Sequence, residues 1–166
     1  MASAVATENG PVALRLIPGL ALWLSVVKIL HVGHGYLPES AGGVELYLRD
    51  LLAAQMEAGH DVALLSGSLQ IWEKAGLEEA QVEGIRVFRL HRQDSFFDHY
   101  AHGFNLDAEK MIVDVLGREQ PDVVHVHQWI RLTSNIVALA EAQDIPAVVT
   151  LHDVHTSCPR TFRVHR

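Results

Sequence analysis

Two adjacent glycines stand where a predicted strand would lead into a predicted helix. Gly42 and Gly43 follow the apolar run Val26–Val32 and precede a helix-like run that begins near Val44. Glycine lets the backbone approach a ligand closely, and the first turn of a helix offers unpaired N–H groups to an anion. The pattern therefore predicts a site for a phosphate group or a sugar hydroxyl.

Two later apolar runs end in histidine. His127 closes the first run, and His152 and Asp153 close the second. At a strand end an imidazole can act as a general base or as a hydrogen-bond donor to a sugar hydroxyl. His125 lies two residues before His127 and so shares a face of the strand with it. We expect His125 to be a hydrogen-bonded structural histidine that lies under a helix.

A metal site is an alternative use of the same side chains. The spacing of His125 and His127, with His152, His155 and Asp153, combines imidazole with carboxylate, which is a usual ligand set for a divalent metal. A metal-dependent hydrolase would use His127, His152, Asp153 and His155. Two phosphate-binding motifs are absent, because the dinucleotide-binding glycine pattern lacks its third glycine and no P-loop sequence occurs.

Alternating apolar patterns predict the elements that must position these residues. Strands are expected at 26–32, 61–66, 84–90, 122–126 and 147–151, and helices at 44–57, 105–120 and 132–142. Between residues 67 and 83 we expect a polar connector. The alternation predicts an α/β fold, a Rossmann-like doubly wound parallel sheet covered on both faces. In such sheets ligands bind outside the carboxyl ends of the strands, where the strand order reverses, so the glycines and histidines should meet there.

Composition narrows the class of protein. The 166 residues are 49% hydrophobic, which is enough for one ordinary core. A formal charge of -7 argues against a nucleic-acid partner, so an anionic ligand would be held locally by backbone amides or single arginines. Cys158 is the only cysteine, which excludes an intramolecular disulfide and fits a reducing compartment such as the cytoplasm.

The first 25 residues differ from the rest. Their apolar run contains Arg15 and a Pro18-Gly19 break, and it is shorter than the roughly 20 residues of a membrane-spanning helix. The basic region of a secretory signal is also missing. We expect residues 1–25 to be a disordered or apolar leader before a single domain at 26–166. A mistaken translation start and a short membrane-surface anchor are the alternatives.

Four stretches of sequence together resemble a known family, the N-terminal domain of glycosyltransferase family 4. The resemblance spans residues 27 to 160. Its motifs, in order, are Lys28–Glu45, Ala58–Val62, Pro121–His127, and Thr150–Asp153 with Cys158–Arg160.

The resemblance implies one half of the two-domain GT-B fold and a reaction without a bound metal or cofactor. Family members transfer a sugar from a nucleotide sugar to an acceptor with retention of anomeric configuration. By position, Gly42 and Gly43 would lie near the donor diphosphate and the reacting sugar, and His127 would be the catalytic residue that contacts that sugar. The resemblance also places His152 and Asp153 along the cleft and makes Arg160 an acceptor contact.

The same resemblance sets the expected partners. They are a nucleotide-sugar donor, a carbohydrate or lipid-linked acceptor, and the C-terminal domain that binds most of the donor in this family. Without that domain we expect the chain to be incomplete and inactive alone. A lipid-linked acceptor would place the protein peripherally at the inner face of the membrane, in cell-envelope polysaccharide biosynthesis. A noncatalytic α/β module that binds a partner chain carrying the missing half remains a second hypothesis, and the metal-dependent hydrolase a third.

Overall fold

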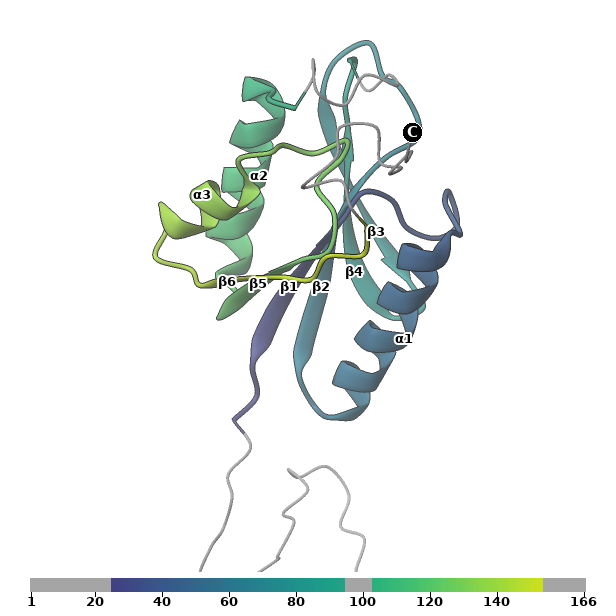
Figure 1. Ribbon diagram of the computed structural model, residues 1–166, viewed down its shortest axis with the longest axis vertical. Helices are drawn as coiled ribbons and strands as arrows, with labels where there is room; N and C mark the ends of the chain where they lie inside the picture. Colours follow the sequence, from purple (N-terminus) through teal and green to yellow (C-terminus); the bar gives the residue numbers. More distant parts are fainter. Residues whose placement is uncertain (1–24, 95–102, 154–166) are drawn as a thin grey trace, which may run out of the picture.

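A six-stranded sheet runs through the computed structural model, which describes residues 25–94 and 103–153 (Figure 1). The strand order across the sheet is β3-β4-β2-β1-β5-β6. The strands are β1 (Lys28–Gly33), β2 (Asp61–Gly67), β3 (Gly76–Val82), β4 (Ile85–His91), β5 (Val123–Val126) and β6 (Ala147–Val149). The helices are α1 (Gly43–Glu57), α2 (Leu106–Glu119) and α3 (Ile136–Glu141).

Strand β1 lies at the point where the strand order reverses. It pairs in parallel with β2 on one side and with β5 on the other. From β1 the chain builds outward through β2 to β4, and it then returns to β5 and β6 on the opposite side. The predicted Rossmann-like doubly wound sheet is confirmed, and its crevice is expected between the carboxyl ends of β1 and β5.

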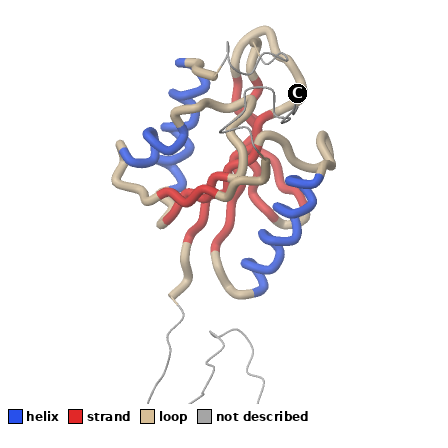
Figure 2. The backbone as a smooth tube through the Cα atoms, viewed as in Figure 1, coloured by secondary structure: helices blue, strands red, loops and turns tan. Residues whose placement is uncertain are grey.

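Helices cover both faces of the sheet. Helix α1 lies on one face, and α2 and α3 lie on the other (Figures 1 and 2). Leu48 and Leu52, one helical turn apart on α1, are fully buried in a cluster with Val62 and Leu64 of β2. A second, larger cluster joins the opposite face of the central strands to α2 and α3. Strands β1, β2 and β4 therefore each contribute side chains to two apolar layers, one on each face of the sheet.

The prediction of a polar connector between residues 67 and 83 is wrong, because β3 occupies its second half. Strand β3 is antiparallel to β4 and forms a hairpin with it. The two-residue turn consists of Glu83 and Gly84, at φ 51° and 83°. Two consecutive positive φ angles are the geometry of a tight hairpin turn that matches the twist of paired strands. Glu78 and Glu79 are exposed on this edge strand, where charged side chains prevent pairing with the strand of another molecule.

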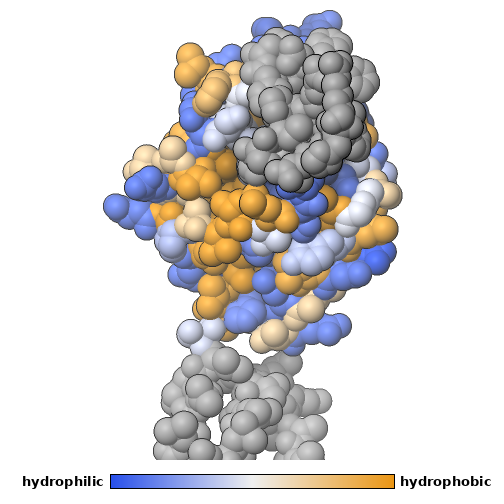
Figure 3. Space-filling model, viewed as in Figure 1, coloured by the Kyte–Doolittle hydropathy of each residue, from blue (hydrophilic) through white to orange (hydrophobic). Residues whose placement is uncertain are grey.

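Strand β6 exposes apolar side chains at the opposite edge of the sheet. Val148 and Val149 of β6 are 51% and 43% exposed, and Leu151, two residues after the strand, is 60% exposed. Apolar surface gathers near the middle of the face in Figure 3, where Figure 1 shows β6 in front. In a doubly wound sheet, helices normally cover apolar side chains of this kind.

Several predictions fall outside the described residues. They concern residues 1–24 of the predicted leader, and also His155, Cys158 and Arg160. Within the parts of the chain that are described, no helix is both long and apolar enough to cross a lipid bilayer.

The close approach at Gly67 gives a test of the packing. A Cβ atom at this position would lie 2.8 Å from the Cβ of Arg131 and 2.9 Å from the backbone oxygen of His34. We expect Gly67→Ala to lower the free energy of unfolding by roughly 1–3 kcal/mol, because backbone must move to admit the methyl group. Urea denaturation measures this change.

The matched control is Gly117→Ala, at an exposed helical position whose nearest new neighbour is 3.9 Å away. We expect this control to gain up to about 1 kcal/mol, because alanine is the better helix former. Equal stability of the two variants would contradict the packing described here.

Candidate functional site

Backbone hydrogen bonds join the carboxyl ends of β1, β5 and β6 at the edge of the sheet where the crevice is expected. The backbone N–H of His127, just after β5, donates to the carbonyl of Val32 at 2.9 Å. The N–H of Thr150, just after β6, donates to the carbonyl of Val126 at 2.9 Å. The loops that follow the three strands are thereby brought together, as the sequence pattern predicted.

Three histidines form a line across this edge of the sheet. Nδ1 of His31 lies 3.0 Å from Nε2 of His127, and Nδ1 of His127 lies 3.1 Å from Nε2 of His152. The line ends inside the protein at Gln55 of α1, whose Oε1 is 2.7 Å from Nε2 of His31. The ring of Tyr47, also on α1, lies beside His127 and His152 with centroids 5.8 and 4.9 Å away. Helix α1 therefore packs directly against His127, the predicted sugar contact, and against His152, which was predicted to line the cleft.

The hydrogen bonds assign the protons along this line. With the amide oxygen of Gln55 as an acceptor, Nε2 of His31 must donate, so Nδ1 of a neutral His31 must accept. Because Nδ1 of His31 accepts, Nε2 of His127 must donate to it. Nδ1 of His127 then accepts from the Nε2–H of His152. Both nitrogens of His127 are thus occupied, and its side chain is buried. The half-buried His152 stands between His127 and solvent.

Burial keeps the inner histidines uncharged. It lowers the pKa of His31 to about 4, an effect reinforced by nearby His125 and opposed by the Gln55 hydrogen bond. It lowers the pKa of His127 to about 3, and the neighbouring histidines His125, His31 and His152 add to this shift. At neutral pH each inner ring therefore carries one proton, as the hydrogen-bond line requires.

Glu45 organises the start of α1. Its buried carboxylate accepts from the backbone N–H of Gly42 at 3.0 Å and from Oγ of Ser40 at 2.6 Å, and it lies 3.3 Å from Nε2 of His34. Burial acts to raise the pKa of Glu45, but the Ser40 bond, backbone N–H groups and His34 lower it below its usual value. The charged carboxylate is therefore a fixed part of the helix start.

The two predicted glycines differ in their surroundings. A Cβ at Gly42 would lie 2.7 Å from Oε2 of Glu45, so a side chain there would displace the carboxylate that caps the helix. A Cβ at Gly43 would meet no atom of the described residues within 4 Å. Gly42 is thus explained by packing within the described chain, whereas Gly43 faces open space at the first turn of α1.

Hydrogen bonds and an ion pair hold the loop between β1 and α1 in place. Nη1 of Arg131 donates to the carbonyl of His34 at 3.1 Å. Glu39 accepts from Oγ of Ser68 at 2.9 Å and pairs with the buried Arg89 at 3.4 Å. These contacts fix the loop that delivers Gly42 and Gly43 to the crevice.

The remaining predicted site residues have other partners. Oδ2 of Asp153 accepts from Nε2 of Gln128 at 2.9 Å. Nε2 of His125 lies 2.8 Å from Oγ1 of Thr150, as expected of a hydrogen-bonded histidine, but its ring faces His31 and His127 rather than standing alone. Of the predicted hydrolase ligands, His127 and His152 come together, while Asp153 is directed to Gln128.

Sequence reasoning did not assign roles to His31, Gln55 and Tyr47. His31 is a polar residue inside an otherwise apolar strand, and this was the available signal. Gln55 and Tyr47 are eight residues apart on α1, which places them near the same helix face. Only the contact between α1 and the sheet shows that this face meets the histidines.

Comparisons with known proteins agree with the fold and the motifs. The sequence profile described as Glycosyltransferase Family 4 matches residues 41–165. The glycogen synthases of Mycobacterium tuberculosis strains H37Rv and CDC 1551 / Oshkosh are each 29% identical over 139 residues, which covers 76% of this chain. This chain spans only 33% of the length of either relative.

Two solved structures share the fold. The apo structure of OtsA superposes with a TM-score of 0.54 and 15% identity, over 76% of this chain and 33% of that one. The α,α-trehalose 6-phosphate synthase from Burkholderia multivorans superposes with a TM-score of 0.51 and 12% identity, over the same shares. The six-stranded, mostly parallel sheet fits a Rossmann-like half of the GT-B fold.

The buried neutral histidines predict a pH-dependent stability. The usual histidine pKa is 6.5, and burial lowers it to about 4 at His31 and about 3 at His127. Between pH 6.5 and these values the unfolded chain binds more protons than the folded one, so the free energy of unfolding falls as the pH is lowered. Each such histidine contributes up to about 1.4 kcal/mol per pH unit.

We expect His31→Gln to reduce this slope between pH 6.5 and 5, measured by urea denaturation at several pH values. The slope is informative even if the variant is less stable at every pH. A variant with the slope of the unaltered chain would show that His31 does not stay neutral in the fold.

Proposed function

Because this chain belongs to glycosyltransferase family 4, we propose that it is the N-terminal, acceptor-side domain of an enzyme that transfers a sugar from a nucleotide sugar with retention of anomeric configuration. The observation that carries the proposal is the meeting of α1, His127 and His152 between β1 and β5. This is the place where a doubly wound sheet binds its ligand. The family match, over residues 41–165, includes α1, β5, His127 and His152 and begins after β1.

In this proposal Gly43 makes room for the donor diphosphate. The space around it is open, and it lies in the first turn of a 15-residue helix. Glu45 already occupies the N–H of Gly42, so the N–H groups of Gly43 and Val44 are the ones left for an anion. The positive end of the helix dipole favours a phosphate there.

His127 is proposed to contact the transferred sugar through Nδ1. A sugar hydroxyl can donate to this nitrogen if it takes the place of the Nε2–H of His152, which now donates there. His31 and Gln55 keep Nδ1 of His127 in the acceptor state by holding the ring proton on Nε2. His152 and the exposed Asp153 would then line the cleft. Arg160 remains the proposed acceptor contact.

Catalysis is proposed to need a second domain. The matched part of this chain covers only 33% of the length of the relatives, and the GT-B fold closes its cleft between two domains. The described residues supply only one wall, and the arginines beside the glycine loop already have partners, Arg131 in the carbonyl of His34 and Arg89 in Glu39. Electrostatic stabilisation of a leaving phosphate requires groups aimed at it from a preorganised site. The 166-residue chain should therefore be inactive alone.

The acceptor is proposed to be a carbohydrate. The relatives' name, glycogen synthase, makes a glycogen-like polymer the first acceptor to test. A lipid-linked acceptor, with the protein peripheral at the inner face of a membrane and acting on cell-envelope polysaccharide, is the second. A cytoplasmic location suits both.

The proposal predicts the outcome of a transfer assay. The purified 166-residue chain should release no nucleotide from UDP-glucose or ADP-glucose, whereas the native protein should transfer the sugar with its anomeric configuration unchanged. Proton NMR of the product reports the configuration. Turnover by the chain alone, or an inverted product, would contradict the proposal.

The intact mass of the native protein should be measured beside the assay. We expect it to exceed this chain by a further domain of about 150–200 residues. A native protein of the same mass as this chain would instead favour the noncatalytic module that acts with a partner.

Gly43 allows function to be separated from stability. In the native protein Gly43→Ala should lower kcat/KM for the nucleotide sugar at least about tenfold, because the methyl group enters the space proposed for the diphosphate. The melting temperature should not fall, since no atom of the described chain lies within 4 Å of the added carbon. Gly117→Ala is the control and should keep full activity. Unchanged kinetics in Gly43→Ala would place the donor elsewhere.

A further inference from the structure

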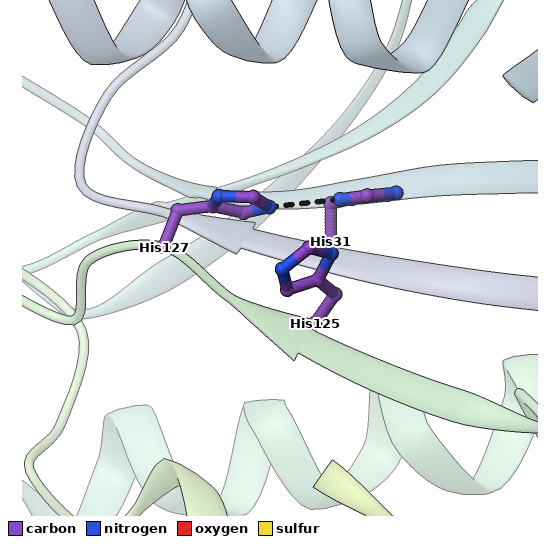
Figure 4. Close-up of side chains that lie close together, drawn as sticks. All are labelled: His31, His125 and His127. Carbon is purple, nitrogen blue, oxygen red and sulfur yellow. Dashed lines mark hydrogen bonds between the residues drawn. The ribbon is translucent and has the colours of Figure 1, made fainter. Parts of the chain in front are cut away.

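His31, His125 and His127 form a compact group beneath the crevice. His31 and His125 are register partners on the neighbouring strands β1 and β5, and His127 follows β5. One ring nitrogen of each residue lies within 4.8 Å of the other two. Figure 4 shows the three rings turned toward one another on one side of the two strands.

The distances suit a metal ion. Zinc binds histidine nitrogen at about 2.0–2.1 Å, and tetrahedral geometry then separates two ligand nitrogens by about 3.3 Å. Nδ1 of His31 and Nε2 of His127 are already 3.0 Å apart. A set with one ring nitrogen from each of the three histidines spans no more than 4.8 Å. Small rotations of the rings would therefore complete three ligand positions.

The other nitrogen of each ring has its own partner. Nε2 of His31 is held by Oε1 of Gln55, and Nε2 of His125 by Oγ1 of Thr150. Nδ1 of His127 faces His152. Histidines that bind a metal normally use their second nitrogen in this way, because the outer bond fixes the ring and its tautomer. Thus Nδ1 is the nitrogen of His125 that remains for an ion.

The protonation state favours binding as well. A metal binds neutral imidazole, and burial lowers the pKa of all three histidines, so protons compete little at neutral pH. The group contains no carboxylate, which makes Mg²⁺ and Ca²⁺ unsuitable. Three imidazoles suit zinc and its first-row neighbours.

We propose that His31, His125 and His127 form a binding site for a divalent transition-metal ion, with Zn²⁺ as the probe. The ion ties β1 to β5 below the crevice. It would bind Nε2 of His127, on the side of the ring opposite the Nδ1 that faces His152. This set differs from the hydrolase ligands considered above, and the inference does not depend on glycosyl transfer.

Zinc would also change the state of His127. The ion takes the lone pair of Nε2, so the proton of that nitrogen must leave and Nδ1 must carry one instead. Nδ1–H then donates to Nε2 of His152, and the proton of His152 resides on its own Nδ1. The pair keeps its charge, but the nitrogen proposed to accept from the sugar becomes a donor.

Calorimetric titration of the EDTA-treated chain with zinc chloride tests the proposal. We expect one ion per chain at micromolar affinity or tighter, and a ¹⁵N spectrum in which His127 changes tautomer. His125→Gln should weaken binding at least about 100-fold. This residue is only half-buried, so the variant should fold even if His31→Gln does not. Gln55→Leu removes an outer partner and should weaken binding about 10- to 100-fold.

His60→Gln is the matched control, because His60 lies outside the group and contacts the backbone N–H of Val27. It should bind zinc like the unaltered chain. Absence of binding, or equal binding by His125→Gln and the unaltered chain, would overturn the proposal. The second result would assign the ion to other histidines.

Discussion

The hydrogen bond between His31 and His127 is the constraint on which this edge of the fold depends. Both side chains are buried, and a buried polar group left without a partner costs about 1–3 kcal/mol. Each ring therefore needs two partners, and these come from β1, β5, α1 and the segment after β6. The requirement couples the position of α1 to the central strands and to the crevice. A histidine line replaces the apolar packing found elsewhere on that face.

The start of α1 is fixed separately, by charge. Glu45 binds the backbone before the helix, and Arg131 and Arg89 hold the preceding loop to the sheet. This arrangement leaves Gly43 at a rigid helix start with open space beside it. A site that is already rigid loses little entropy when it binds a ligand. The proposed donor position thus follows from a helix cap and a loop anchor.

Much of the fold could be predicted from the sequence, because parallel strands and amphipathic helices leave strong apolar patterns. The helix from Val44 and the strand ending in His127 are within a few residues of the observed elements. Strand β3 was missed because an exposed edge strand has a weak pattern, although the turn at Gly84 was a usable signal. The partners of His31 could not be predicted, because His127 lies 96 residues away and the contact depends on strand register. The glycine and histidine motifs mark where ligand binding is proposed, but the bond between His127 and His152 could be found only from the fold.

The most direct test of the account follows the imidazoles of the native protein during ligand binding. Selective ¹⁵N labelling of histidine, with assignments from His127→Gln and His152→Gln, reports the state of each ring nitrogen. On saturation with the nucleotide sugar that the protein turns over, the account predicts shifts at His127 and His152. Unchanged resonances from both rings, in a sample that still transfers sugar, would contradict it. The sugar would then bind away from the crevice between β1 and β5.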